Sequence, residues 1–285
     1  MNAKRCVWFS WRWRPGVALG VMLGALVGSI SFAASVSVNP AADAFVTTGP
    51  TGNLSNSNYG GAGALSVAAP GSAQGEFQSV MQFNLAGARS SFDAQFGVGQ
   101  WSLQSVMLQV TAALPNNGIF NPSAAGQFAV SWMQNDSWVE GTGTPNGPSA
   151  TGINFSSLQG TFVGAGDESL GTFGFDGSTT APATYNLTLS SGFAADLLAG
   201  NNVSLRMFAA DSGVSYLFDS RNFSTVASRP LLTLTAVPEP GSGALVGMAA
   251  LGAALRRRFG GGVKKFENRN PNLAQPEPNA ELDHG

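Results

Sequence analysis

Short apolar runs separated by turn-forming residues fill the chain between Ser35 and Ala236. Several runs alternate apolar and polar residues with a period of two, as Ser105–Val110 and Tyr185–Leu189 do. This alternation is typical of strands, and many such runs at short spacing indicate a β-sandwich or a β-barrel. The predicted strands are Phe45–Thr48, Leu65–Ala69, Phe77–Phe83, Leu103–Ala112, Gln127–Met133, Gly160–Val163, Ser169–Phe175, Ala183–Leu189, Val203–Ala209, Ser215–Phe218 and Leu231–Thr235.

One segment departs from the strand pattern and predicts a short helix over Ser191–Gly200. Apolar residues recur there at helical spacing from Phe193 onward. Ser190 or Ser191 can cap the start of this helix, and Gly200 can end it. We therefore expect an all-β domain with one short helix packed over one end of the sandwich.

A basic stretch at the N-terminus is followed by the uncharged apolar run Val17–Ile30. Small residues at the −3 and −1 positions predict cleavage after Ala33, with Ala34 as the second choice. Residues 1–34 are therefore predicted to be a secretory signal peptide, and an uncleaved N-terminal anchor is the alternative. The single cysteine, Cys6, lies in this segment, so the mature protein is expected to contain no disulfide.

A second handling signal lies near the C-terminus and has three unlike parts. A proline-rich acidic motif comes first, then the uncharged run Ser242–Leu255, then an arginine cluster. The prolines fix φ, which makes the motif extended and accessible. The apolar run has 14 residues, fewer than the ~20 that span a hydrocarbon core, and the arginines favour the cytoplasmic side. The motif and cluster residues are Val237, Pro238, Glu239, Pro240, Arg256, Arg257 and Arg258.

Residues 237–258 resemble the PEP-CTERM sorting segment of Gram-negative bacteria, which some ice-binding proteins also carry. The resemblance implies cleavage near the Pro-Glu-Pro motif by an exosortase-type enzyme, a transient membrane anchor, and delivery to the cell surface or extracellular matrix. Such segments usually end soon after the basic cluster, whereas this chain continues through a polar tail at 259–285. A short permanent hydrophobic helix with a disordered cytoplasmic tail is the alternative interpretation.

The predicted ectodomain, residues 35–236, is acidic. It contains four arginines, no lysine and eleven carboxylates, which gives a net charge of −7. Nucleic-acid binding needs a basic surface and is therefore excluded, whereas neutral glycans, or anionic ones bridged by a cation, fit better. The single histidine, His284, lies in the tail. Histidine-based catalytic triads and zinc sites built on histidine or cysteine are therefore excluded from the ectodomain.

A second resemblance extends over residues 36–236. Its pieces are Asp43–Val46, Asn58–Gly60, Phe83–Leu85, Asp136–Gly141, Phe218–Asn222 and Arg229–Leu232. In this order they resemble the jelly-roll domains named after a DNRLRE-type motif, a group that includes carbohydrate-binding modules. The resemblance implies a jelly-roll-like antiparallel β-sandwich that contacts polysaccharide. The closing motif of that family often has an acid where this chain has Asn222, so any role of that acid does not carry over.

Two aromatic side chains in these pieces are candidate ligand contacts. Tyr59 lies in a turn, since Asn and Gly tolerate positive φ, and it could stack on a sugar or plug the core. Trp138 lies between Asp136 and Glu140, and its indole could form a pyranose platform or anchor a loop in the interior. The buried, structural interpretation is favoured for both side chains.

Charged residues complete the candidate set. Asp219 and Arg221 are two positions apart on a predicted strand, so they share a face. Arg221 is expected to form a structural ion pair with Asp43 or Asp219, and Glu140 is the remaining candidate for ligand binding. The acidic pair Asp167–Glu168 could bind Ca²⁺ with backbone carbonyls, although the spacing of recognised calcium loops is missing there. No other cofactor is expected.

These observations predict a non-catalytic, exported protein of the cell surface or extracellular matrix that contacts exopolysaccharide. One alternative is a glycosidase or lyase that degrades polysaccharide with a carboxylate pair, for instance Glu140 with Asp219. Another is a structural matrix protein or an ice-binding protein, although the sequence lacks the regularly spaced threonines that an ice-binding surface needs.

Overall fold

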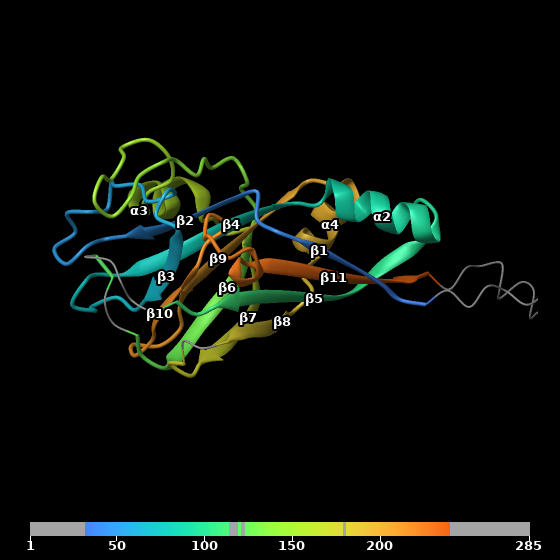
Figure 1. Ribbon diagram of the computed structural model, residues 1–285. Helices are drawn as coiled ribbons and strands as arrows, with labels where there is room; N and C mark the ends of the chain where they lie inside the picture. Colours follow the sequence, from blue (N-terminus) through green and yellow to red (C-terminus); the bar gives the residue numbers. More distant parts are fainter. Residues whose placement is uncertain (1–31, 114–118, 121–122, 179–180, 240–285) are drawn as a thin grey trace, which may run out of the picture. The chain divides into compact units, whose positions relative to one another are not determined.

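The computed structural model describes residues 32–113, 119–120, 123–178 and 181–239 (Figure 1). The predicted signal peptide up to residue 31, the predicted C-terminal hydrophobic helix and the tail lie outside these residues. Within the described part of the chain, no helix is both long and apolar enough to cross a bilayer.

Two antiparallel sheets form the domain, as the alternating pattern predicts (Figure 1). The first sheet has four strands, in the order β1 (Ala34–Val38), β11 (Leu231–Pro238), β5 (Trp101–Thr111) and β8 (Pro182–Leu187). The second sheet has the order β10 (Ser215–Asp219), β3 (Ala64–Ala68), β4 (Phe77–Asn84), β9 (Asn202–Ala209), β6 (Gly126–Met133) and β7 (Glu168–Phe175), and β2 (Ala42–Thr47) pairs with β4.

The main hydrophobic core lies between the two sheets. Val106, Leu108 and Val110 of β5 are buried on the shared face that their spacing predicts. They belong to the same buried cluster as Met81 and Phe83 of β4 in the other sheet. Burial of apolar surface on both inner faces, at about 25 cal/mol per Å², holds the two sheets together as a sandwich.

The predicted helix is present as α4 (Ser191–Ala199). The Ser190 hydroxyl accepts a hydrogen bond from the backbone N–H of Phe193 at 3.3 Å, which caps the helix start. Gly200 ends it with φ = 72°, a left-handed conformation that suits glycine. Its neighbour α2 (Ala86–Phe96) was not predicted. Only Ala88 and Phe92 of α2 are buried, so the sequence carries little helical periodicity there.

A long connection between β6 and β7 covers the outer face of the second sheet. It contains α3 (Phe155–Ser157) and a single π-helical turn, η2 (Leu158–Phe162). The prediction of a strand over Gly160–Val163 is therefore wrong for this segment. Asn154 and Ser157 form a capping box that starts a helix, and the buried Leu158 holds that helix against the sheet.

Candidate functional site

The last strand of the sandwich contains the beginning of the proline-rich motif. In β11, Val237 pairs with Ser102 and Pro238 pairs with Trp101 of β5. The backbone N–H of the next residue, Glu239, donates to the carbonyl of Gln100 at 2.9 Å. The motif is extended, as its prolines predict, but the strand continues two residues past the predicted domain end at 236. Proline is tolerated here because it lies at the last position of a strand.

Both ends of the domain leave the sandwich from neighbouring strands. Ala34, the first residue of β1, pairs with Ala236 of β11, and the start of β1 and the end of β11 lie at the same end of the sheet (Figure 1). The predicted signal cleavage after Ala33 falls immediately before β1, and Ala33 is exposed. Cleavage there would leave the whole of β1 in the mature protein.

Pairing of the motif with β5 limits where the C-terminal segment can be cut. Peptidases generally need an unpaired, extended backbone, and the backbone is paired up to Glu239. We expect the mature protein to retain Val237 and Pro238 and to end at Glu239 or beyond. Mass spectrometry of the exported protein measures this directly, and a C-terminus before Pro238 would contradict it.

Arg221 forms the predicted structural ion pair, but with a different partner. Its Nε donates to Oε1 of Glu140 at 2.7 Å, and its Nη2 donates to the other oxygen of the same carboxylate. Asp43 contributes through the backbone instead, because its Oδ2 accepts the N–H of Arg221 at 2.6 Å. The N–H of Asp43 in turn donates to Oε1 of Glu140 at 3.2 Å. Three segments far apart in sequence are therefore tied together at Glu140.

Two buried carboxyl groups near this ion pair have raised pKa values. Burial raises the pKa of Asp43 to about 7, and the neighbouring Glu140 carboxylate adds to the effect. Burial also raises the pKa of Asp219 to about 6, and this residue is 4% exposed. Both oxygens of Glu140 bind Arg221. The proposed catalytic pair of Glu140 and Asp219 therefore lacks the accessible, unpaired carboxylates that glycoside hydrolysis requires.

The two candidate aromatic residues are both buried. Tyr59 is 1% exposed, and its ring stacks on Phe45 with centroids 4.9 Å apart. Trp138 is 4% exposed, and its indole N–H donates to the hydroxyl of Ser204 at 2.9 Å. Neither ring face is available as a platform for a sugar, which agrees with the structural interpretation.

Asn58 holds the loop that carries Glu140, a role that was not predicted. Its Nδ2 donates to the carbonyls of Glu140 at 2.6 Å and Ile153 at 2.7 Å. Its Oδ1 accepts the N–H groups of Gly60 at 3.2 Å and Gly143 at 3.1 Å. All four hydrogen-bonding positions of this buried amide are therefore used.

The two carboxylates considered for Ca²⁺ serve separate backbone segments. Asp167 accepts the N–H groups of Gln134 at 3.0 Å and Gly164 at 3.3 Å. Glu168 accepts the hydroxyl of Ser191 at 2.6 Å and a backbone N–H at the start of α4 at 2.8 Å. In the part of the chain that the structure describes, no three His, Cys, Asp or Glu side chains are grouped as metal ligands.

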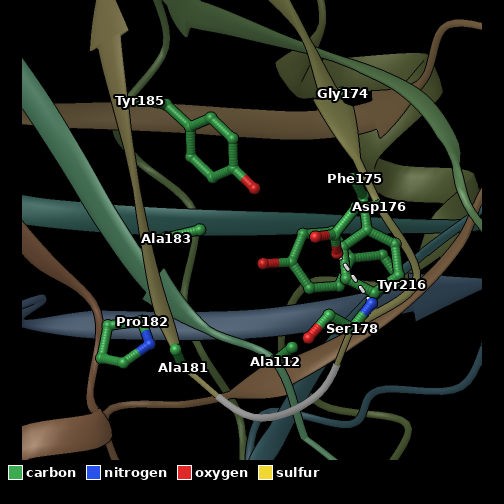
Figure 2. Close-up of a pocket in the computed structure, with 10 residues that line it drawn as sticks. All are labelled: Ala112, Gly174, Phe175, Asp176, Ser178, Ala181, Pro182, Ala183, Tyr185 and Tyr216. Atoms are coloured by element: carbon green, nitrogen blue, oxygen red, sulfur yellow. Dashed lines mark hydrogen bonds between the residues drawn. The ribbon is translucent and has the colours of Figure 1, made fainter.

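A cavity of about 260 Å³ opens between β7 and β8, which belong to different sheets. Figure 2 shows the hydroxyl groups of Tyr185 and Tyr216 pointing into this space. The Tyr216 ring stacks on Phe175 with centroids 3.8 Å apart and forms an apolar wall. Asp176 lies at the rim, where its carboxylate accepts the N–H of Ser178 at 2.7 Å.

The tyrosine hydroxyls of the cavity are neutral hydrogen-bonding groups. Burial raises the pKa of Tyr216 far above its usual value, and the neighbouring Tyr185 adds to this shift. Burial also raises the pKa of Tyr185. The Tyr216 hydroxyl is buried and finds no hydrogen-bond partner among the described residues. Such a group destabilises the protein by about 1–3 kcal/mol, which a ligand hydroxyl meeting it would offset.

Sequence reasoning placed these cavity residues on strands but did not identify the cavity. The alternation over Tyr185–Leu189 indicates that Tyr185 faces the interior, and Tyr216 lies in the predicted strand Ser215–Phe218. Nothing in the local pattern shows that β7 and β8 diverge between the sheets. The position of the cavity depends on the packing of two sheets rather than on any motif.

Comparison with protein families gives one finding. The family model described as the PEP-CTERM protein-sorting motif matches residues 236–258. The chain carries a PEP-CTERM sorting motif. The motif indicates an exported protein of the Gram-negative cell envelope or surface, handled by an exosortase at a membrane-associated C-terminus. A search of curated proteins found no match to the chain. The match begins at Ala236, so the PEP-CTERM motif overlaps the last residues of β11.

Proposed function

We propose that this protein is a non-catalytic surface protein whose β-sandwich contacts extracellular polysaccharide through the cavity between β7 and β8. The observation that carries the proposal is the buried, unpartnered hydroxyl of Tyr216 facing that cavity. The resemblance of the ectodomain to carbohydrate-binding jelly-roll modules and its delivery to the cell surface by the PEP-CTERM motif both support it.

The size and lining of the cavity suit one sugar unit of a chain. Its volume of about 260 Å³ is close to the lower end of small-molecule pockets, which begin at ~300 Å³. Two tyrosine hydroxyls and the Asp176 carboxylate can each hydrogen-bond a sugar hydroxyl. The aromatic wall formed by Phe175 and Tyr216 packs against the apolar C–H face of a pyranose.

The charge of the site selects among glycans. Asp176 is the charged residue in the cavity lining, and the ectodomain as a whole has a net charge of −7. An anionic sugar would be repelled unless a cation bridged the two carboxylates. The proposed ligand is therefore a neutral or amino sugar within an exopolysaccharide.

Calorimetric titration of the exported protein with exopolysaccharide from its own host tests this proposal. We expect Tyr216→Phe and Asp176→Asn each to weaken binding about tenfold, which corresponds to the loss of about one hydrogen bond. Tyr59→Phe is the matched control, because this tyrosine is buried in a different cluster, and it should leave the affinity unchanged.

Two results would count against the proposal. Absence of binding to every glycan tested, with and without Ca²⁺, would remove polysaccharide contact altogether. Binding that Tyr216→Phe and Asp176→Asn leave unchanged would remove the cavity as the site.

A further inference from the structure

An apolar groove lies at the end of the sandwich from which both chain ends leave. It has a volume of about 460 Å³, and its lining comes from the start of β5, from the residue Leu189 beyond β8, from α4 and from Glu239. Leu189 and Leu198 keep 40% and 51% of their surface exposed. Exposed leucines that border a groove mark an interaction surface more strongly than scattered apolar residues do.

The chain itself brings this groove close to a membrane. Glu239 lines the groove and is also the residue from which the chain continues into the sorting segment. The uncharged run begins at Ser242, three residues later, and three residues span at most ~10 Å. Whenever this run is inserted in a bilayer, the groove is held within about that distance of the lipid surface.

Further apolar side chains are exposed at the same end. Phe32 is 76% exposed and lies two residues before β1, whose first residue pairs with Ala236. Val98 is 75% exposed and lies two residues before Gln100, which binds Glu239. Six large apolar side chains are strongly exposed in the described part of the chain, and four of them are at this end. Their concentration here would be unusual for a surface that faces only water.

The charged groups at this end favour an apolar contact over an electrostatic one. Asp93 accepts the indole N–H of Trp101 at 2.8 Å and pairs with Arg89 at 3.4 Å. Asp196 accepts the indole N–H of Trp132 at 2.9 Å. The ectodomain contains no lysine. The basic cluster that recognises anionic headgroups is therefore missing here, and insertion of apolar side chains is the remaining source of affinity.

We propose that this end of the domain docks on the bilayer surface while the sorting segment is in the membrane, with Leu189 and Leu198 inserted among neutral headgroups and upper acyl chains. Docking would hold the domain in one orientation on the membrane. It would also keep the end of the motif, just beyond Glu239, at a fixed height for the membrane-bound processing enzyme.

Fluorescence quenching in vesicles tests the docking. The full-length chain with Cys6→Ser is labelled with an environment-sensitive dye at Leu198→Cys and placed in phosphatidylcholine vesicles that contain lipids brominated near the headgroup. Val226→Cys is the matched control, since Val226 is 63% exposed and precedes β11 at its opposite end. We expect the label at 198 to be quenched at least about threefold more than the label at 226.

The remaining outcomes are equally defined. Quenching at 198 should persist in high salt and should not increase when phosphatidylglycerol is added. Equal quenching at the two positions would overturn the proposal. A label at 198 that is shielded from water but not from brominated lipid would show that protein covers the groove. Quenching that rises with protein concentration would indicate a second copy instead.

Discussion

Replacing Asn58 with Ala should destabilise the folded domain by about 3–5 kcal/mol, because buried groups that lose their partners cost about 1–3 kcal/mol each. The substitution removes the partners of two carbonyls, at Glu140 and Ile153, and of two N–H groups, at Gly60 and Gly143. It also releases the loop that positions Glu140 against Arg221. Chemical denaturation of the exported protein, followed by tryptophan fluorescence, measures the free energy of unfolding.

Two further variants separate the hydrogen bonds from a general effect of substitution. Asn58→Asp keeps the acceptor but loses both donors and places a negative charge beside two carbonyls, so it should destabilise at least as strongly. Asn56→Ala, at an exposed position two residues earlier, should change stability by less than about 0.5 kcal/mol. Equal effects of Asn58→Ala and Asn56→Ala would contradict the assigned role.

Asp43 should make the protein less stable as pH rises from about 4 to about 7. Its carboxyl group has a pKa of about 7 in the folded protein against 3.8 for the ordinary group. Between these values the unfolded chain has lost the proton and the folded chain has kept it, so raising the pH favours unfolding. The contribution is fully present below about pH 4 and is lost above about pH 7, an effect of roughly 3–4 kcal/mol at 1.36 kcal/mol per pKa unit.

Asp43→Asn isolates this dependence because an amide resembles the protonated acid. The variant should be more stable than the parent at pH 8, and its unfolding free energy should vary less with pH. Asp219, with a raised pKa of about 6, contributes a residual dependence of the same sign. Asp211→Asn is the control of opposite sign, because three backbone N–H groups lower the pKa of Asp211. A parent protein that gains stability between pH 5 and 8 would argue against a buried, protonated Asp43.

Many of the elements could be predicted from the sequence, with informative exceptions. Period-two alternation located β5 and β8, and the Ser190 and Gly200 caps located α4. The same reasoning placed a strand where η2 forms, because four residues at Gly160–Val163 carry too little periodicity to separate a strand from a helical turn. It also missed α2, whose interior contact depends on only two side chains.

The candidate site shows the same division. Arg221 was expected to pair with a carboxylate, since an arginine in an acidic domain has many such neighbours. The partner, Glu140, is 81 residues away in sequence, and two carboxylates other than Glu140 were considered for it. Only the packing of the β6–β7 connection against β2 decides which carboxylate Arg221 meets.

The sequence by itself determined the export signals, the acidic charge of the ectodomain, the absence of histidine from it and the strand-rich fold. These properties depend on composition and on local backbone geometry, which short segments carry with them. The tertiary structure decided that Tyr185 and Tyr216 face one cavity, that Asn58 ties the Glu140 loop, and that the PEP-CTERM motif begins inside β11. Each of these depends on contacts between segments far apart in the chain, and such contacts form only when two sheets and their connections pack together.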